Sequence, residues 1–167
     1  MSPSPTEEYV ASLTELGPGD LEVLRAHAGL PLDRSVVGFD LFTSLWWPLR
    51  ERSPQAPRRE AAWLVAKLYA KVPLAHHPGR KMAIQLCHAQ PKEPRAAKSF
   101  QERFDRLVTS SLSDIEPSLR WALRAIASRQ SALDWVALTN DLSRWRRAST
   151  RERWVKEFLD QNETSTE

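Results

Sequence analysis

Residues 134–145 read DWVALTNDLSRW, and this stretch decides the fold class because its apolar residues recur with a helical period. They stand three, four and three positions apart and are Trp135, Leu138, Leu142 and Trp145. That spacing places the four side chains on one side of an α-helix. We therefore predict a helix here, capped by Ser131, with this stripe buried in the core.

The same period extends in both directions from this stretch, for example over residues 58–72 and 95–109. Prolines and helix caps divide the chain into about nine such segments, and no run shows the sustained alternation of a strand. We predict an all-α fold of about nine helices in one compact bundle over residues 1–160, followed by a flexible tail at 161–167. Two helical lobes meeting near residues 90–95, between prolines, are the alternative.

Proline also sets two of the predicted helix boundaries. Pro48 should limit a helix over residues 39–49, because a proline inside a helix removes a hydrogen bond. Ser113 and Glu116 have the spacing of a capping box, which would start the next helix near residue 113. Pro117 fits that arrangement badly, so a start nearer Pro117 is the alternative.

The sequence carries no sign of export or of a membrane span. Its first residues, MSPSPTEEYVASL, are acidic and lack the basic and apolar regions of a signal peptide. The apolar runs are far shorter than a transmembrane helix. The single cysteine, Cys87, excludes an internal disulfide framework and fits a reducing compartment. We expect a cytoplasmic protein.

Residues that could support catalysis are few. The metal-like set consists of His76, His77, Cys87 and His88, whose spacing matches no standard zinc site. We interpret it as a buried thiol beside a surface imidazole. Asp134 suits a helix start and Asp141 an ion pair with a neighbouring arginine. No glycine-rich phosphate loop is present in the sequence. We expect no metal, no cofactor and no enzymatic activity.

The net charge of +3 conceals an uneven distribution along the chain. Residues 1–49 carry two basic and seven acidic residues, whereas residues 50–92 carry nine basic and two acidic ones. Residues 95–154 carry twelve basic and seven acidic residues. Such a concentration of positive charge suits a polyanionic partner, although solvated helix faces would give the same counts.

The placement of the basic residues adds to this argument. Arg103 and Arg106 are three apart, and Arg120 and Arg124 are four apart, so each pair shares a helix face. Basic residues also open two helices, at Arg58-Arg59 and at Arg80-Lys81, and others gather where the last two helices meet: Arg144, Arg146, Arg147 and Arg151. Arginine binds phosphate with two parallel hydrogen bonds, and helix N-termini bind phosphate too.

The tryptophans have a simpler interpretation. Trp135, Trp145 and Trp154 lie on apolar stripes and are expected to pack in the core rather than to stack on bases. Trp46 and Trp47 are adjacent and point to different sides of a helix, so one of them should be exposed, where a partner protein is a better match than a nucleobase.

The chain resembles the CasB family, the small subunit of the type I-E CRISPR surveillance complex called Cascade. The likeness covers about residues 17–160 and is carried by three stretches. The first is Gly19-Asp20 followed by Leu24-Arg25. The second is Glu102-Arg103-Phe104 with Leu107, followed by Leu119-Arg120. The third and most specific is DWVALTNDLSRW followed by RERWVKEFL at 151–159.

This resemblance implies an all-α, non-catalytic protein that joins Cascade as a pair of copies beside the guide RNA, contacts other Cascade subunits, and holds target DNA, notably the displaced strand, thereby stabilising the R-loop. Arg25, Arg103 and Arg120 are the basic residues matched by motif position. The remaining predicted nucleic-acid-binding residues rest on charge clustering: Arg58, Arg59, Lys81, Arg106, Arg124, Arg144, Arg146 and Arg147. Trp121 departs from the family, which often has a second arginine there.

Three other interpretations stay open at this point. A helical scaffold that contacts only proteins would depend on Trp46 or Trp47 and not on the arginines. A helix-turn-helix regulator needs base-reading residues near the start of a recognition helix, and we find no persuasive one. A Cys/His enzyme would depend on Cys87.

Overall fold

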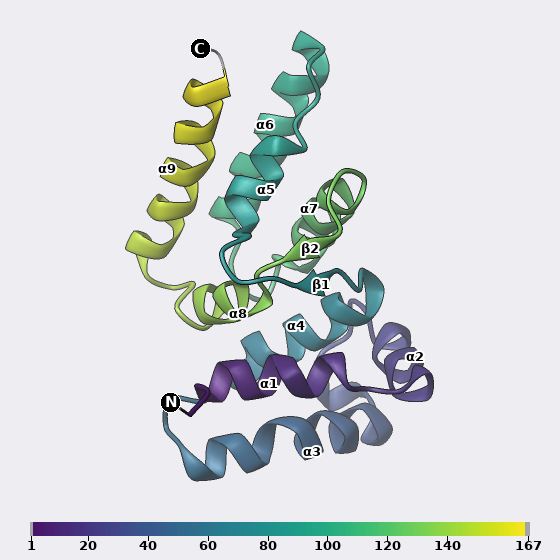
Figure 1. Ribbon diagram of the computed structural model, residues 1–167. Coiled ribbons are helices and arrows are strands. Elements are labelled where there is room, and N and C mark those ends of the chain that lie inside the picture. The colour runs from purple at the N-terminus through teal and green to yellow at the C-terminus, as the bar shows by residue number, and fades with distance from the viewer. Residues whose placement is uncertain (1, 166–167) are drawn as a thin grey trace.

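The computed structural model describes the backbone of residues 2–165 and the side chains of residues 2–160 (Figure 1). Within these residues the chain forms nine α-helices, one 3-10 helix and two strands of two residues each. In chain order they are α1 (Pro5–Thr14), α2 (Pro18–Ala26), η1 (Leu32–Arg34), α3 (Val36–Arg52), α4 (Arg59–Lys71), β1 (Ala75–His76), α5 (Met82–His88), α6 (Pro94–Thr109), α7 (Glu116–Ala127), β2 (Ala132–Leu133), α8 (Trp135–Ser143) and α9 (Ala148–Ser165). The predicted all-α class is confirmed. Over the described residues, the helices are too short or too polar to cross a bilayer.

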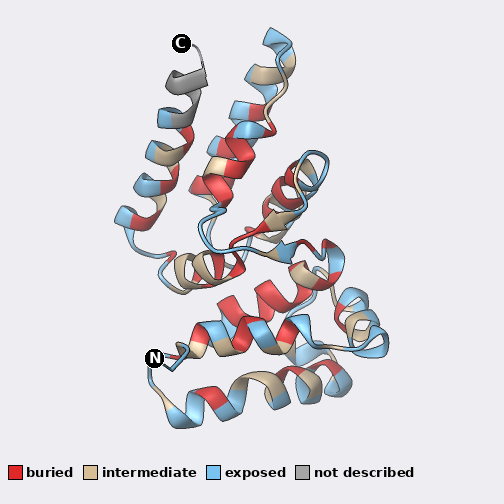
Figure 2. Cartoon of the chain, in the orientation of Figure 1, coloured by how far each residue is buried: buried red, intermediate tan, exposed pale blue. Residues whose placement is uncertain are grey.

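Helix α4 lies at the centre of one end of the molecule. It packs against α2, α7 and α8, while α1 packs against α3 and α8 (Figure 1). At the other end α5 packs against α7 and α9. Figure 2 shows that buried residues follow α4 and the inward sides of the other helices. The buried apolar side chains form one cluster, and a lobe boundary near residues 90–95 stays a prediction.

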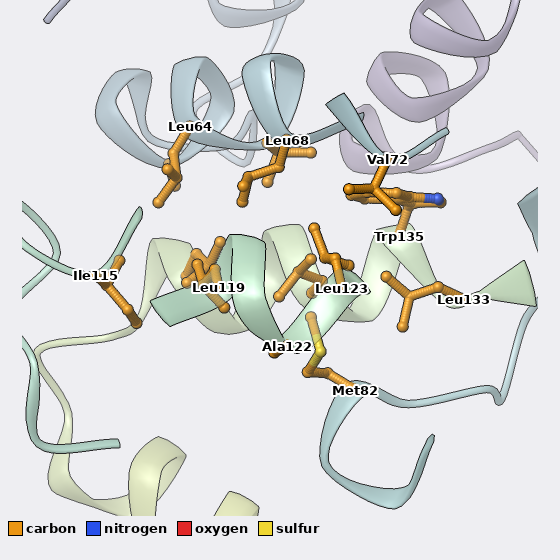
Figure 3. Close-up of a cluster of buried hydrophobic side chains, with 14 of the residues drawn as sticks. Leu64, Leu68, Val72, Met82, Ile115, Leu119, Ala122, Leu123, Leu133 and Trp135 are labelled. Carbon is orange, nitrogen blue, oxygen red and sulfur yellow. The ribbon is translucent and has the colours of Figure 1, made fainter. Parts of the chain in front are cut away.

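Helix α7 supplies the centre of this cluster. Leu119 and Leu123 are fully buried, and Figure 3 shows them facing Leu64 and Leu68 of α4, with Met82 of α5 on the other side of α7. Burying a leucine side chain contributes about 1.5–3 kcal/mol. Because α7 presents apolar residues to α4 and to α5, it joins the two ends of the molecule.

The structure contains a short parallel pairing that the sequence did not indicate. Ala75 of β1 pairs with Ala132 of β2, and His76 pairs with Leu133. Two residues are too few to show an alternating pattern, so the strand signal is missing from the sequence. The pairing places Asp134 at the start of α8. Its Oδ1 accepts a hydrogen bond from Ala137 N at 2.9 Å, so the prediction of Ser131 as the cap was wrong.

Two other helix boundaries differ from expectation. Helix α3 continues through Pro48 to Arg52, because Pro48 and Ser44 are both exposed and water can bond the carbonyl that proline leaves unpaired. Helix α7 begins at Glu116, close to the Pro117 alternative. The capping box with Ser113 was wrong, because the Glu116 carboxylate bonds Lys67 and Gly29 instead.

The predicted tail, residues 161–167, overlaps the end of α9, whose backbone is described up to Ser165. Residues 166–167 lie outside the described residues, and the flexibility of the tail stays a prediction.

Candidate nucleic-acid interface

The start of α4 carries two of the predicted arginines. Arg58 is the N-cap of this helix and follows Pro57 in an extended conformation. Its main-chain N–H donates to Ser143 Oγ at 3.2 Å, which ties the start of α4 to the end of α8. Arg144 caps the C-terminus of α8. The fold therefore brings basic residues from near position 58 and near position 144 to the same place.

Three pockets that share lining residues extend from the start of α4 to the first turns of α9. The first, of about 260 Å³, lies between the end of α3 and the start of α4 and is lined by Trp46, Arg50, Pro57, Arg58, Arg59 and Glu60. The second, of about 390 Å³, is lined by Glu60, Ser110, Ser111, Leu112, Ser113, Trp145, Arg146 and Arg151. The third, of about 340 Å³, is lined by Val108, Ala148, Arg151, Glu152 and Val155. We call these three pockets together the arginine groove, because the first and second share Glu60 and the second and third share Arg151.

Five arginines line the arginine groove: Arg50, Arg58, Arg59, Arg146 and Arg151. Sequence reasoning placed Arg58, Arg59 and Arg146 in the binding set. It noted Arg151 without including it, and it missed Arg50, which lies in the last turn of a helix that was expected to end earlier. Predicting that the helix continues through Pro48 would have placed Arg50 in its last turn, near the start of the next helix.

The positive charge of the groove is little compensated. Among the described side chains, Arg58 and Arg146 form no ion pair with a carboxylate. Arg59 Nη2 lies 3.6 Å from Glu60 Oε1, and both side chains are more than half exposed, so this pair contributes little stability. Arg50 Nη1 donates to the main-chain oxygen of Pro54 at 3.1 Å, which leaves its charge unpaired. The groove therefore keeps a local excess of positive charge.

Indole groups hold the walls of the groove. Trp46 Nε1 donates to Pro57 O at 2.7 Å, and Trp145 Nε1 donates to Ser110 O at 2.8 Å. Trp135, Trp145 and Trp154 are buried, which confirms that they pack in the core. Trp47 is 51% exposed whereas Trp46 is half-buried, so the two adjacent indoles do differ in exposure.

A second set of predicted residues lies on α6 and α7: Arg103, Arg106, Arg120 and Arg124. We call it the α6–α7 basic face. The Arg103 guanidinium lies 5.6 Å from the centre of the Trp121 ring, which also packs on Phe100. Trp121, the departure from the family pattern, thus contacts an arginine of the predicted binding set. Glu116 stands one turn before Arg120 but is bonded to Lys67, so within the described residues it does not neutralise this face.

The remaining predicted residues are not joined to these sets. Arg25 is exposed on α2, and Lys81 is the N-cap of α5, with its Nζ 3.8 Å from Glu157 Oε1. The described contacts bring neither of them beside another predicted residue. Arg144 and Arg147 are exposed on either side of Arg146 without lining the groove.

The groups considered for catalysis have structural partners. Cys87 is buried and His88 is exposed, as predicted, and burial raises the pKa of the Cys87 thiol. His76 Nδ1 accepts a hydrogen bond from Trp135 N at 3.1 Å. Asp141 is paired with Arg153, as predicted, and accepts a hydrogen bond from Trp154 Nε1. In the described part of the chain, no three histidine, cysteine or acidic side chains gather as a metal site would require.

Fold and groove together define a small all-helical protein with clustered arginines whose charge is little compensated. The chain belongs to the family described as CRISPR-associated protein Cse2, whose model matches residues 21–158. The expected relationship to CasB proteins is thereby confirmed.

Solved structures share this fold. CasB from M. ruber has a TM-score of 0.78 at 20% identity, covering 99% of this chain and 98% of that one. CasB from Thermus thermophilus has a TM-score of 0.71 at 24% identity, covering 95% and 99%. A chain of a CRISPR RNA-guided surveillance complex has a TM-score of 0.70 at 20% identity, covering 97% and 95%. No curated protein sequence matches the chain.

Proposed function

We propose that this protein is the non-catalytic small subunit of a CRISPR Cascade complex and that its arginines bind the backbone of guide RNA and target DNA, including the displaced strand, and so stabilise the R-loop. Membership of the Cse2 family supports this proposal, as does the similar fold of a chain in a CRISPR RNA-guided surveillance complex. Its proposed partners are other Cascade subunits and a second copy of itself, in the cytoplasm.

The arginine groove is the observation that carries the proposal. Segments far apart in the sequence, at residues 50–59 and 146–151, contribute guanidinium groups to adjoining pockets. Arginine suits phosphate oxygens because its planar fork donates parallel hydrogen bonds. Such contacts are independent of base sequence, and guide pairing supplies the specificity in a guide-directed complex.

Binding of single-stranded oligodeoxythymidylate over a range of salt concentrations tests this function. Wild type should bind modestly, with an affinity that falls steeply with salt, because each neutralised phosphate releases counterions. Charge reversal of the groove (Arg58→Glu with Arg146→Glu) or of the α6–α7 basic face (Arg103→Glu with Arg120→Glu) should weaken binding and flatten its salt dependence.

Arg129→Glu is the matched control, because Arg129 is exposed but belongs to neither set. Equal binding by wild type, control and both reversals would contradict backbone binding by these arginines. Unequal loss between the two reversals would show which set carries more of the affinity.

A protein-only scaffold is the second candidate. It is favoured by exposed apolar side chains at the start of α3 and on the loop before η1: Leu30, Val36, Val37 and Phe39, with Trp47 further along α3. A scaffold predicts that Trp47→Ala abolishes assembly with other subunits while every arginine reversal leaves nucleic-acid binding unchanged.

A further inference from the structure

The middle pocket of the arginine groove is built from segments that lie far apart in the sequence. Glu60 comes from α4, Ser110–Ser113 from the loop after α6, Arg146 from the connection after α8, and Arg151 from the start of α9. Its volume is about 390 Å³. We call it the serine-loop pocket.

Arg151, which lines this pocket, has one nitrogen without a partner. Its Nε is buried and makes no hydrogen bond with any described atom. A buried guanidinium N–H without an acceptor is costly, and such groups are rare in folded proteins. Arg146 lines the same pocket, is exposed, and forms no ion pair with a described side chain. Two arginines thus line one pocket, and neither forms an ion pair with a described carboxylate.

The loop of residues 110–113, which we call the serine loop, offers main-chain donors rather than hydroxyl donors. Ser111 Oγ donates to Asp114 Oδ2 at 2.9 Å and lies 3.1 Å from Ser113 Oγ, and Ser110 Oγ donates to Arg106 O at 2.7 Å. These hydroxyls are therefore occupied. The main-chain N–H groups of residues 111–113 donate to none of the described atoms. Main-chain amides without partners and arginine side chains are donor types that phosphate oxygens match.

The two walls of the pocket are fixed to each other. Trp145 is buried, its Nε1 donates to Ser110 O, and its ring packs edge-on against Trp154 of α9. The connection that carries Arg146 and the start of α9 that carries Arg151 are therefore held against the serine loop before any ligand arrives. A preorganised site loses little side-chain freedom on binding.

Acidic groups oppose this donor set. Glu60 lines the pocket with a side chain that is 55% exposed, and Asp114 lies just beyond the serine loop. A carboxylate beside bound phosphate weakens binding through like-charge repulsion. Glu60 is thus expected to reduce the affinity of the pocket and to keep binding reversible.

We propose that the serine-loop pocket holds one phosphodiester group of the nucleic-acid backbone as a fixed anchor, gripped jointly by Arg146 and Arg151, while the other arginines contact the backbone loosely. This rests on the proposed function and adds to it a position at which the strand is held. The shared grip distinguishes an anchor from a diffuse basic surface, because both arginines then contact the same phosphate.

The test is the binding of oligodeoxythymidylate to Arg146→Gln, Arg151→Gln and the double variant across a salt series, with Arg129→Gln as the matched control. Each single variant should bind about tenfold more weakly than wild type. Each should lower the salt slope by about 0.7, which corresponds to one phosphate of a single strand. The double variant should lower it by the same amount, because only one phosphate is lost. Glu60→Gln should tighten binding.

A double variant whose slope falls by twice that of either single variant would overturn the anchor, since the two arginines would then hold separate phosphates. The anchor is also wrong if both single variants bind like wild type while Arg58→Gln with Arg59→Gln binds weakly, although the proposed function would stand. If no arginine variant weakens binding, the proposed function itself fails.

Titration with inorganic phosphate at constant ionic strength separates the two sources of a phosphate group. Displacement of the oligonucleotide from wild type, and none from the double variant, supports the anchor. Binding of inorganic phosphate that leaves the oligonucleotide in place would mean a free-phosphate site and would overturn it. Should Arg151→Gln fail to fold, Arg151→Lys, which keeps the charge but not the fork, should bind more weakly than wild type, and equal binding would contradict the shared grip.

Discussion

Lys67 Nζ lies 2.6 Å from Glu116 Oε1, and in this ion pair between α4 and α7 the side chains are 5% and 12% exposed. Lys67 also donates to Leu30 O at 2.8 Å and lies 5.1 Å from the centre of the Trp63 ring. The other carboxylate oxygen of Glu116 accepts from Gly29 N at 2.5 Å. Both charged groups therefore have hydrogen-bond partners, and together they tie the loop after α2 to the two central helices.

Removing one partner of this pair should destabilise the fold strongly. Lys67→Met leaves the Glu116 carboxylate buried without its cation, at a cost of about 3–5 kcal/mol. Urea unfolding measures this as a lower midpoint. Lys67→Met with Glu116→Leu should regain much of the loss, because no buried charge is then left unpaired. A double variant as unstable as Lys67→Met alone would show that the charges are not what stabilises this contact.

The cap of α8 gives a second test. Asp134 Oδ1 accepts from Ala137 N and Oδ2 accepts from Gly79 N at 2.8 Å, so Asp134→Ala removes a helix cap and a link to the loop after β1. We expect a loss of about 2 kcal/mol in the free energy of unfolding. Ser131→Ala is the matched control and should change it by less than about 0.5 kcal/mol. Equal losses for the two variants would restore Ser131 as the cap.

The fold class followed from periodicity because most of its determinants are local. Trp135, Leu138 and Leu142 are buried along α8 as their spacing indicates, and Trp145 is buried just beyond the end of that helix. The pairing of Ala75 with Ala132 depends on tertiary packing, which no local pattern encodes. Glu116 shows the same limit: its spacing from Ser113 satisfies a capping rule, yet a lysine far away in the sequence takes its carboxylate.

The candidate site was predictable in residue type but only partly in position. Arginines cluster in the sequence around residues 58 and 146, and the fold places these clusters along one groove. The sequence does not indicate that Glu60 would line the groove between these clusters, because its position there depends on how α4 is oriented in the fold. Lys81 shows the converse, since a basic residue at a helix start proved to lie beside Glu157 on α9.

The thiol of Cys87 should react slowly in the folded protein. Cys87 is buried, and burial raises its pKa, so the reactive thiolate is scarce at neutral pH. A thiol reagent such as dithiobis(nitrobenzoate) at pH 8 should modify the native protein far more slowly than the urea-unfolded protein. Cys87→Ala gives the background rate. Native and unfolded protein reacting at the same rate would contradict the burial of this side chain.

Glu157 should make the stability of the protein depend on pH. Burial raises its pKa above the ordinary value of 4.5; Lys81 and Arg153 act against this rise, and Asp141 adds to it. The pKa of Glu157 is higher in the folded than in the unfolded protein, so at a pH between these two pKa values the folded state binds more protons. The free energy of unfolding therefore falls as pH rises through this range.

Glu157→Gln does not titrate and should therefore gain stability relative to wild type between pH 4 and pH 7. Urea unfolding at both pH values measures the difference, and Glu152→Gln, an exposed residue one turn earlier on α9, is the matched control. If the wild type instead becomes more stable relative to Glu157→Gln as pH rises, the attraction of Lys81 and Arg153 outweighs the effect of burial on this carboxylate.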